Sequence, residues 1–127
     1  DRLRSRGLGD VYKRQEYEAL ILGKGYDHNW ILNHAPGETE LSAAAESDKT
    51  GIRMEVYTDL PGMQFYTGNF LGAGPAGKNG MVYAPRYGYC FETQYYPNAV
   101  NMPEFPSPVL KAGEEYRTTT IYRFTRW

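Results

Sequence analysis

The chain has 127 residues, 41% of them hydrophobic and 15% aromatic, and a formal net charge of −1. This length fits one small domain, and the charge argues against a nucleic-acid partner or an anionic membrane surface. The single cysteine, Cys90, excludes an internal disulfide, and no apolar run approaches the roughly twenty residues of a membrane helix. A cytoplasmic location is therefore expected.

The first segment, DRLRSRGLGDVYKRQ at residues 1–15, resembles a translated sequencing adapter. The match to a transposon-based adapter runs through residues 5–15 without a mismatch. We expect residues 1–15 to be a non-native, disordered scar and exclude them from fold reasoning. Their basic residues would otherwise indicate a nucleic-acid-binding arm or a targeting peptide. Setting them aside removes five positive and two negative charges, which takes the net charge from −1 to −4.

Residues 16–127 predict an all-β fold. Tyr is the leading aromatic residue with twelve copies, Gly and Pro are frequent, and no helical periodicity persists. Residues 41–58, LSAAAESDKTGIRMEVYT, predict a β-hairpin with a five-residue loop ending at Gly51. The helix propensity of LSAAAE is outweighed because six residues make a short helix and the strand after the turn is well marked.

Alternation of side chains predicts the remaining strands in chain order. MQFYTGN places Gln64 and Tyr66 on one face, and CFETQYY places Glu92 on one face with Cys90 and Gln94. EYRTTTIYRF forms the last strand. Between them, residues 70–80 predict a glycine-rich loop and residues 101–114 an extended, proline-rich crossing. Because several sheet edges would be open, we expect a fragment of a large antiparallel β-sandwich.

The sequence contains no motif that indicates a bound cofactor. The chain contains no P-loop, Rossmann glycine pattern, CxxC or HExxH motif. His28 and His34 lack a clustered set of further ligands, so neither a metal nor another cofactor is expected. Cys90 is expected to be a small buried filler, since a neighbouring carboxylate does not activate a thiol.

The stretch GYCFETQYYPNAVN places Glu92 in what otherwise looks like a buried strand, where a charge is expensive unless it is paired or used. Together with Asp27 and Gln64 it offers groups that hydrogen-bond sugar hydroxyls. Each also has a structural interpretation: Asp27 as a turn or cap residue, Gln64 as a solvent-facing strand residue, and Glu92 in an ion pair with Arg86. The residues alone therefore indicate a β-rich domain and leave both the structural roles and sugar binding open.

Four segments carry a family resemblance, and they are GYDHNWIL at residues 25–32, EVYTDLPGMQFYTGNFL at 55–71, GKNG at 77–80 and FETQYYPNAVNMPEFPSPVLKAGEEYRTTTIYRF at 91–124. In this order they resemble the C-terminal portion of aldose 1-epimerases (galactose mutarotases). The resemblance implies that residues 16–127 are the C-terminal part of such a domain, with the galactose mutarotase-like supersandwich fold. It also implies an isomerase that interconverts the α and β anomers of free hexoses such as galactose or glucose, without metal or nucleotide.

The resemblance carries over three site residues. Glu92, within ETQ, matches the family's general base; Asp27, within GYDHN, matches a ligand of a substrate hydroxyl; and Gln64, within QFYTGN, matches a second polar contact to the sugar. The family's two catalytic histidines and a sugar-contacting arginine lie upstream of GYDHN, and neither His28 nor His34 occupies a matching position. We therefore expect this chain alone to be inactive.

Two other functions are compatible with these residues. One is a non-catalytic carbohydrate-binding β-domain that uses the same aromatic and carboxylate surface. The other is a relative of the epimerases that acts on phosphorylated hexoses, which would require a cluster of arginines or lysines for the phosphate.

Overall fold

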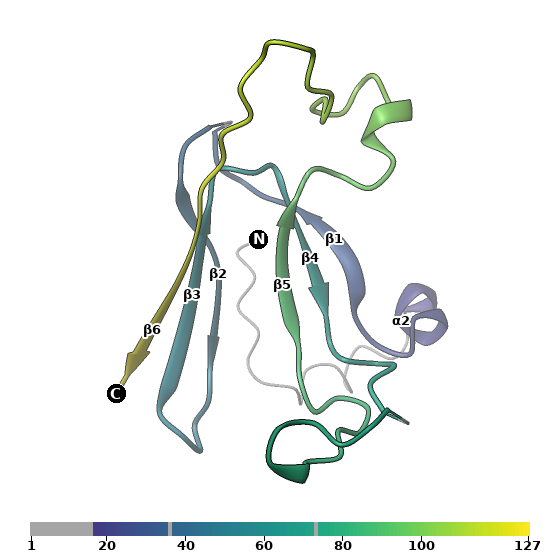
Figure 1. The fold of residues 1–127 in the computed structure, drawn as a ribbon, viewed down its shortest axis with the longest axis vertical. Helices are drawn as coiled ribbons and strands as arrows, with labels where there is room; N and C mark the ends of the chain where they lie inside the picture. The colour runs from purple at the N-terminus through teal and green to yellow at the C-terminus, as the bar shows by residue number, and fades with distance from the viewer. Residues whose placement is uncertain (1–16, 36, 73) are drawn as a thin grey trace.

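The computed structural model describes residues 17–35, 37–72 and 74–127. Within them, two antiparallel sheets of three strands face each other (Figure 1). One sheet has the order β1-β4-β5, with β1 at Asp27–Ile31, β4 at Gly62–Tyr66 and β5 at Cys90–Gln94. The other has the order β2-β3-β6, with β2 at Glu40–Glu46, β3 at Ile52–Thr58 and β6 at Thr120–Arg126. The all-β prediction is confirmed, while the predicted scar at residues 1–15 lies outside the described residues.

The predicted hairpin is the pair β2 and β3, and its loop is residues 47–51. The amide of Gly51 donates to the Ser47 carbonyl at 2.8 Å, and the Ser47 amide donates to the Ile52 carbonyl at 2.9 Å. Gly51 has φ +67°, a left-handed conformation that glycine adopts without steric cost. The turn thus sets the register that pairs Ala43 with Val56.

The hydrophobic core lies between the two sheets. It contains Ala43 and Val56 from one sheet and Met63, Phe65 and Phe91 from the other. The side chains of Val56 and Met63 are 0% exposed, and burial of each contributes about 1.5 to 3 kcal/mol. The rings of Phe65 and Phe91 stack with centroids 5.1 Å apart, which ties β4 to β5.

The last strand is only partly covered by the described residues. Tyr122 and Phe124 belong to its core-facing side, because Tyr122 pairs with Val56 and Phe124 pairs with Met54. Nevertheless they are 47% and 65% exposed. The strand also begins at Thr120, five residues later than the stretch EYRTTTIYRF predicts.

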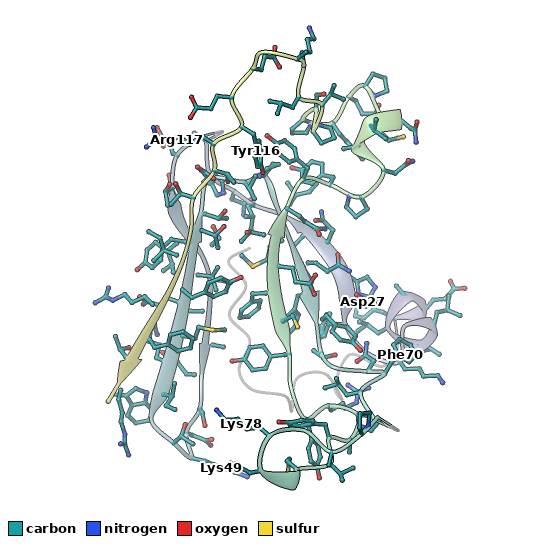
Figure 2. All side chains as sticks on the ribbon, viewed as in Figure 1. Asp27, Lys49, Phe70, Lys78, Tyr116 and Arg117 are labelled. Atoms are coloured by element: carbon teal, nitrogen blue, oxygen red, sulfur yellow. The ribbon has the colours of Figure 1, made fainter. Side chains whose placement is uncertain are left out.

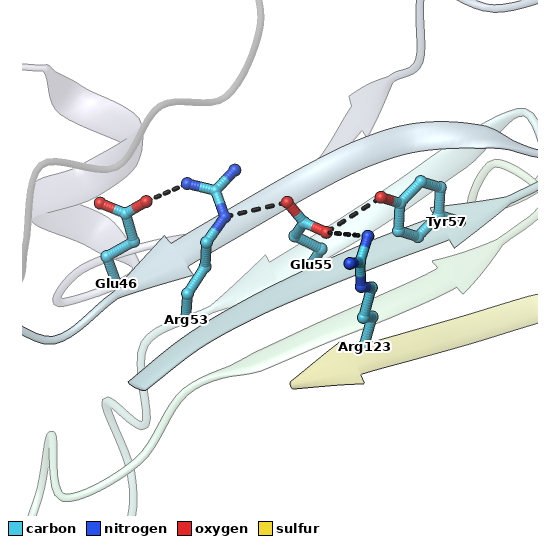
Figure 3. A network of polar contacts seen from close by, with 5 residues as sticks. All are labelled: Glu46, Arg53, Glu55, Tyr57 and Arg123. Atoms are coloured by element: carbon cyan, nitrogen blue, oxygen red, sulfur yellow. Dashed lines mark hydrogen bonds and ion pairs between the residues drawn. The ribbon is translucent and has the colours of Figure 1, made fainter. Parts of the chain in front are cut away.

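A polar network crosses the opposite face of the β2-β3-β6 sheet (Figure 3). At its centre the Glu55 carboxylate accepts hydrogen bonds of 2.9 Å from Arg53 Nε and from Tyr57 Oη, and Arg123 Nη1 lies 3.6 Å away. Arg53 also pairs with Glu46. The hydrogen bond from Arg53 is the main cause that lowers the pKa of Glu55. The network therefore links side chains of β2, β3 and β6 across the outer face of this sheet.

The connections between the strands agree with the predicted loops. The glycine-rich segment between β4 and β5 contains one 3₁₀ turn, Lys78–Gly80, and a second turn, Ala99–Asn101, begins the proline-rich crossing from β5 to β6 (Figure 1). A short helix that the sequence did not predict, α2 at Glu18–Leu22, precedes β1. None of the helices in the described part of the chain has the length and apolar character of a membrane span.

Candidate functional site

The outward side of the β1-β4-β5 sheet carries all three predicted site residues. Gln64 on the central strand β4 is in register with Glu92 on β5 and, on its other side, with Asn29 on β1. Asp27 lies two residues before Asn29 and therefore points to the same side of β1. Figure 2 places Asp27 beside α2, on the side of its sheet away from β2-β3-β6. The opposite side of these strands holds Phe65 and Phe91 of the core.

Asp27 and Gln64 are in direct contact. Gln64 Nε2 donates a hydrogen bond of 2.7 Å to Asp27 Oδ1. Asp27 is the first residue of β1, so its interpretation as a turn or cap residue is wrong. The sequence suggested a turn because Gly25 precedes it, and Gly25 does have a positive φ of +139°.

Glu92 is exposed, and so the expectation that it lies in a buried strand is wrong. The strand alternates: Phe91 enters the core while Glu92 points outward. An exposed carboxylate keeps most of its hydration, which removes the energetic argument for a paired partner. The ion pair between Glu92 and Arg86 stays a prediction; Arg86 donates a hydrogen bond to the carbonyl oxygen of Lys24.

Two further amides, Asn29 and Gln94, extend this surface; the sequence placed Gln94 on the face of Glu92 but named neither amide as a site residue. Gln94 Nε2 donates to Asn29 Oδ1 at 3.0 Å. We call the outward-facing set Asp27, Asn29, Gln64, Glu92 and Gln94 the polar face. The alternation of DHNWI would have placed Asn29 beside Asp27, had residues 27–31 been recognised as a strand.

Gly62 leaves the space in which the side-chain amides of Asn29 and Gln94 meet. A Cβ atom at Gly62 would lie 2.8 Å from Asn29 Oδ1 and 2.9 Å from Cδ1 of Tyr96. The Tyr96 ring packs edge-to-face against Phe105 at 5.2 Å, which anchors it on the proline-rich crossing. A tyrosine ring therefore borders the polar face, as an apolar surface beside groups that bind hydroxyls.

Neither histidine belongs to the polar face by its position in the fold. His28 pairs with Phe65 and so lies on the core side of β1, where its Nδ1 accepts the amide hydrogen of Asp27 at 3.0 Å. His34 follows β1, and its electrostatic interaction with Asp59 is a minor cause that lowers the pKa of that carboxyl group. Among the described residues, no group of three or more His, Cys, Asp or Glu side chains is placed to hold a metal ion.

Cys90 is exposed, so its interpretation as a buried filler is wrong. It lies two residues before Glu92 on the same side of β5, in register with Tyr66. Partial burial raises the pKa of its thiol, and the charge of Glu92 raises the pKa further. The thiol is thus mostly protonated at neutral pH, which makes it a poor nucleophile.

The chain is similar to known carbohydrate enzymes along most of its length. The family model "Aldose 1-epimerase" matches residues 3–123. Galactose mutarotases of Sus scrofa and Homo sapiens are each 48% identical over 101 residues, which is 80% of this chain and 29% of the relative. An aldose 1-epimerase of Escherichia coli (strain K12) is 38% identical over 103 residues, covering 80% of this chain and 30% of the relative.

The fold is similar to a solved structure as well. The crystal structure of a GalM/aldose epimerase homologue from C. elegans aligns with a TM-score of 0.70 at 26% identity, over 80% of this chain and 30% of that chain. The chain therefore spans about 30% of the length of the curated relatives that it matches.

Proposed function

Because the chain belongs to the aldose 1-epimerase family, we propose that it is the C-terminal part of an enzyme that interconverts the α and β anomers of free hexoses such as galactose or glucose. The observation that carries this proposal is the polar face, on which Gln64 contacts Asp27 and is in register with Glu92. The names of the relatives support the reaction, and the exposed core-facing side chains of β6 support a larger sandwich.

In this mechanism Glu92 is the general base. Its exposed carboxylate takes the proton from the C1 hydroxyl while an acid protonates the ring oxygen. The ring opens to the aldehyde, the C1–C2 bond rotates, and closure on the other face returns both protons. Since His28 lies on the core side of β1, we place the acid in a part of the enzyme beyond this chain, and we expect the chain alone to be inactive.

Asp27 and Gln64 hold the sugar while this occurs. Asp27 Oδ1 already accepts a hydrogen bond from Gln64, so its second oxygen is the acceptor for a substrate hydroxyl. Gln64 orients that carboxylate and offers its amide as the second polar contact. A small neutral hexose is the expected partner, and the cytoplasmic location stays a prediction.

The test is polarimetry of α-D-galactose and α-D-glucose with the protein extended upstream to full length. We expect Glu92→Gln to lower kcat by about 10² to 10⁴-fold, the usual contribution of a general base. Because Glu92 is exposed, the thermal midpoint should not change. Glu40→Gln, at an exposed position on β2, is the matched control and should retain full activity.

Two results would contradict the proposal. Full activity of Glu92→Gln would remove Glu92 from the mechanism. Sugar binding without any anomerisation by the unaltered full-length protein would instead favour the non-catalytic carbohydrate-binding domain.

A further inference from the structure

A buried polar cluster lies where β1 begins and β4 ends. Thr67 and Asn69 follow β4, and they are 0% and 6% exposed. Both contact the segment 23–26, which connects α2 to Asp27, the first residue of β1. The two strand ends lie side by side near α2 (Figure 1). The cluster therefore adjoins the backbone that carries one of the predicted sugar ligands.

Every polar atom of the Asn69 side chain is paired. Nδ2 donates to the carbonyl oxygens of Gly23 at 3.0 Å and of Tyr26 at 2.9 Å, which uses both of its hydrogens. Oδ1 accepts the hydroxyl hydrogen of Thr67 at 2.7 Å. Because two carbonyls face Nδ2 and a donor faces Oδ1, this amide has one favourable orientation. Asn69 thus binds both ends of the segment 23–26.

Thr67 fixes the residue immediately before Asp27. Its amide donates to the Tyr26 carbonyl oxygen at 3.0 Å, and its Oγ1 accepts the Tyr26 amide hydrogen at 3.1 Å. The Tyr26 carbonyl already accepts from the Thr67 amide and from Asn69 Nδ2, so the hydroxyl hydrogen of Thr67 is left for Asn69 Oδ1. Strand ends are the parts of a sheet that open most easily. These bonds therefore keep the first residue of β1 from fraying.

Gly25 permits this close approach. It has a φ of +139°, and a Cβ atom there would lie 2.3 Å from Asn69 Oδ1 and 2.9 Å from Thr67 Oγ1. Glycine is needed for the backbone conformation and for the space, because a larger residue would displace Asn69 from the carbonyls that it binds. The glycine that suggested a turn before Asp27 thus makes room for the cluster.

Asp27 reaches its partner diagonally across the two strands. Gln64 Nε2 donates to Asp27 Oδ1 at 2.7 Å. Directly opposite Asp27, however, stands Tyr66, and directly opposite Gln64 stands Asn29. Diagonal neighbours in an antiparallel pair are about 7 to 8 Å apart, farther than opposite ones. The hydrogen bond therefore requires that β1 stays paired up to its first residue.

We propose that Asn69 and Thr67 are positioning residues of the sugar site. By holding the segment 23–26 they fix the Asp27 carboxylate against Gln64, where it accepts a hexose hydroxyl. The role in sugar binding rests on the proposed function. Asp27 binds the sugar in the ground state and in the transition state alike, so loss of the cluster should raise KM with little change in kcat.

The first experiment replaces Thr67→Val in the full-length protein, which keeps the shape of the side chain and removes its hydroxyl. We expect KM for galactose to rise about tenfold, as for one hydrogen bond lost at a charged group, and kcat to change less than about threefold. Thr67→Ser keeps the hydroxyl and should restore KM.

Thr58→Val is the matched control. Thr58 is as buried as Thr67, and its Oγ1 likewise accepts a backbone amide hydrogen, from Leu60 at 3.2 Å. This variant should lose stability but leave KM and kcat unchanged. An unchanged KM for Thr67→Val, or an equal rise for both variants, would show a merely structural role and overturn the proposal.

A second variant perturbs the cluster from the other side. In Gly25→Ala the new Cβ meets Asn69 Oδ1, so KM should rise as in Thr67→Val. Gly113→Ala is its control, because Gly113 also has a positive φ, +88°, and no heavy atom of the described residues lies within 4 Å of a Cβ there. Equal KM values for the two alanine variants would contradict the role of the cluster.

Amide hydrogen exchange of the same full-length variants tests the positioning independently of activity. The amides of residues 26–31 should exchange faster in Thr67→Val than in Thr58→Val, because opening of the strand end exposes them. Equal exchange would overturn the proposal. If the unaltered protein does not anomerise hexoses, the proposed function fails; the calorimetric Kd for galactose then takes the place of KM, and the exchange rates still decide whether the cluster holds β1.

Discussion

Thr58 provides a sharp test of how the two sheets are joined. Its side chain is 0% exposed, and its Oγ1 accepts the Leu60 amide hydrogen at 3.2 Å. The same oxygen lies 3.3 Å from Thr120 Oγ1, which in turn lies 2.7 Å from Thr93 Oγ1 on β5. Hydroxyl groups thus connect β3, β6 and β5 across the sandwich. Thr58→Val keeps the shape of this side chain and removes its hydroxyl.

The expected cost follows from the partner that is left behind. Leu60 is buried, so its amide loses its acceptor without gaining water, at about 1 to 3 kcal/mol. The contact with Thr120 is long for a hydrogen bond between hydroxyls and adds little. Burial of the extra methyl group offsets part of the loss. We therefore expect the free energy of unfolding to fall by about 1 to 2 kcal/mol.

Urea unfolding of the full-length protein measures this difference. With a slope of about 1 to 3 kcal/mol per molar urea, the midpoint should fall by about 0.3 to 2 M. Thr120→Val is the matched control: its hydroxyl bonds to other hydroxyls, which rotate to new partners, so its shift should be smaller. Equal shifts for the two variants, or no shift for Thr58→Val, would refute the assigned role of the Leu60 amide.

Two further predictions concern charge. The charge of Glu92 raises the pKa of the Cys90 thiol, so Glu92→Gln should lower that pKa. Cys90, the only cysteine of this chain, should then react faster with an aromatic disulfide reagent at pH 7 to 8. An unchanged rate would contradict the effect of Glu92 on the thiol. Burial raises the pKa of Asp59, but hydrogen bonds from Thr118 and Thr119 outweigh it and leave that pKa below its ordinary value. Its stabilising effect is therefore complete above the unfolded pKa of about 3.9 and is lost as the pH falls through the lower folded value. The stability difference between the protein and Asp59→Asn should shrink below about pH 4, and urea titrations that find a constant difference would contradict the assignment.

The strands with clear alternation could be predicted because each has one side in the core. The β2-β3 hairpin was predicted with its loop, since Gly51 marks the turn and Val56 and Met54 alternate with charged residues. The face shared by Glu92 and Gln94 followed from the same two-residue period. The beginning of β6 was placed too early, because the alternation of side chains already starts before Thr120, the residue at which pairing with Thr58 of β3 begins.

The errors arose where local sequence signals outweighed the tertiary pairing. Asp27 was read as a turn residue because Gly25 lies before it, although pairing with Tyr66 makes Asp27 the start of a strand. Cys90 was expected to be a buried filler because a neighbouring carboxylate does not activate its thiol, but its position in β5 turns it outward with Glu92. Helix α2 has five residues, too few to produce a periodic pattern.

The correction at Glu92 changes the reason for regarding it as functional. A buried charge would have required a use because of its cost, whereas an exposed one requires none. What distinguishes Glu92 is its surroundings: on this side of the sheet its cross-strand neighbours are Gln64 and, one strand further, Asn29. Their partners Asp27 and Gln94 are also polar, while the reverse side holds the core residues Met63, Phe65 and Phe91. Alternate residues of the same strands thus face the core on one side of the sheet and the proposed sugar site on the other. Substitutions on the core side should therefore change the free energy of unfolding, and substitutions on the polar face should change sugar turnover.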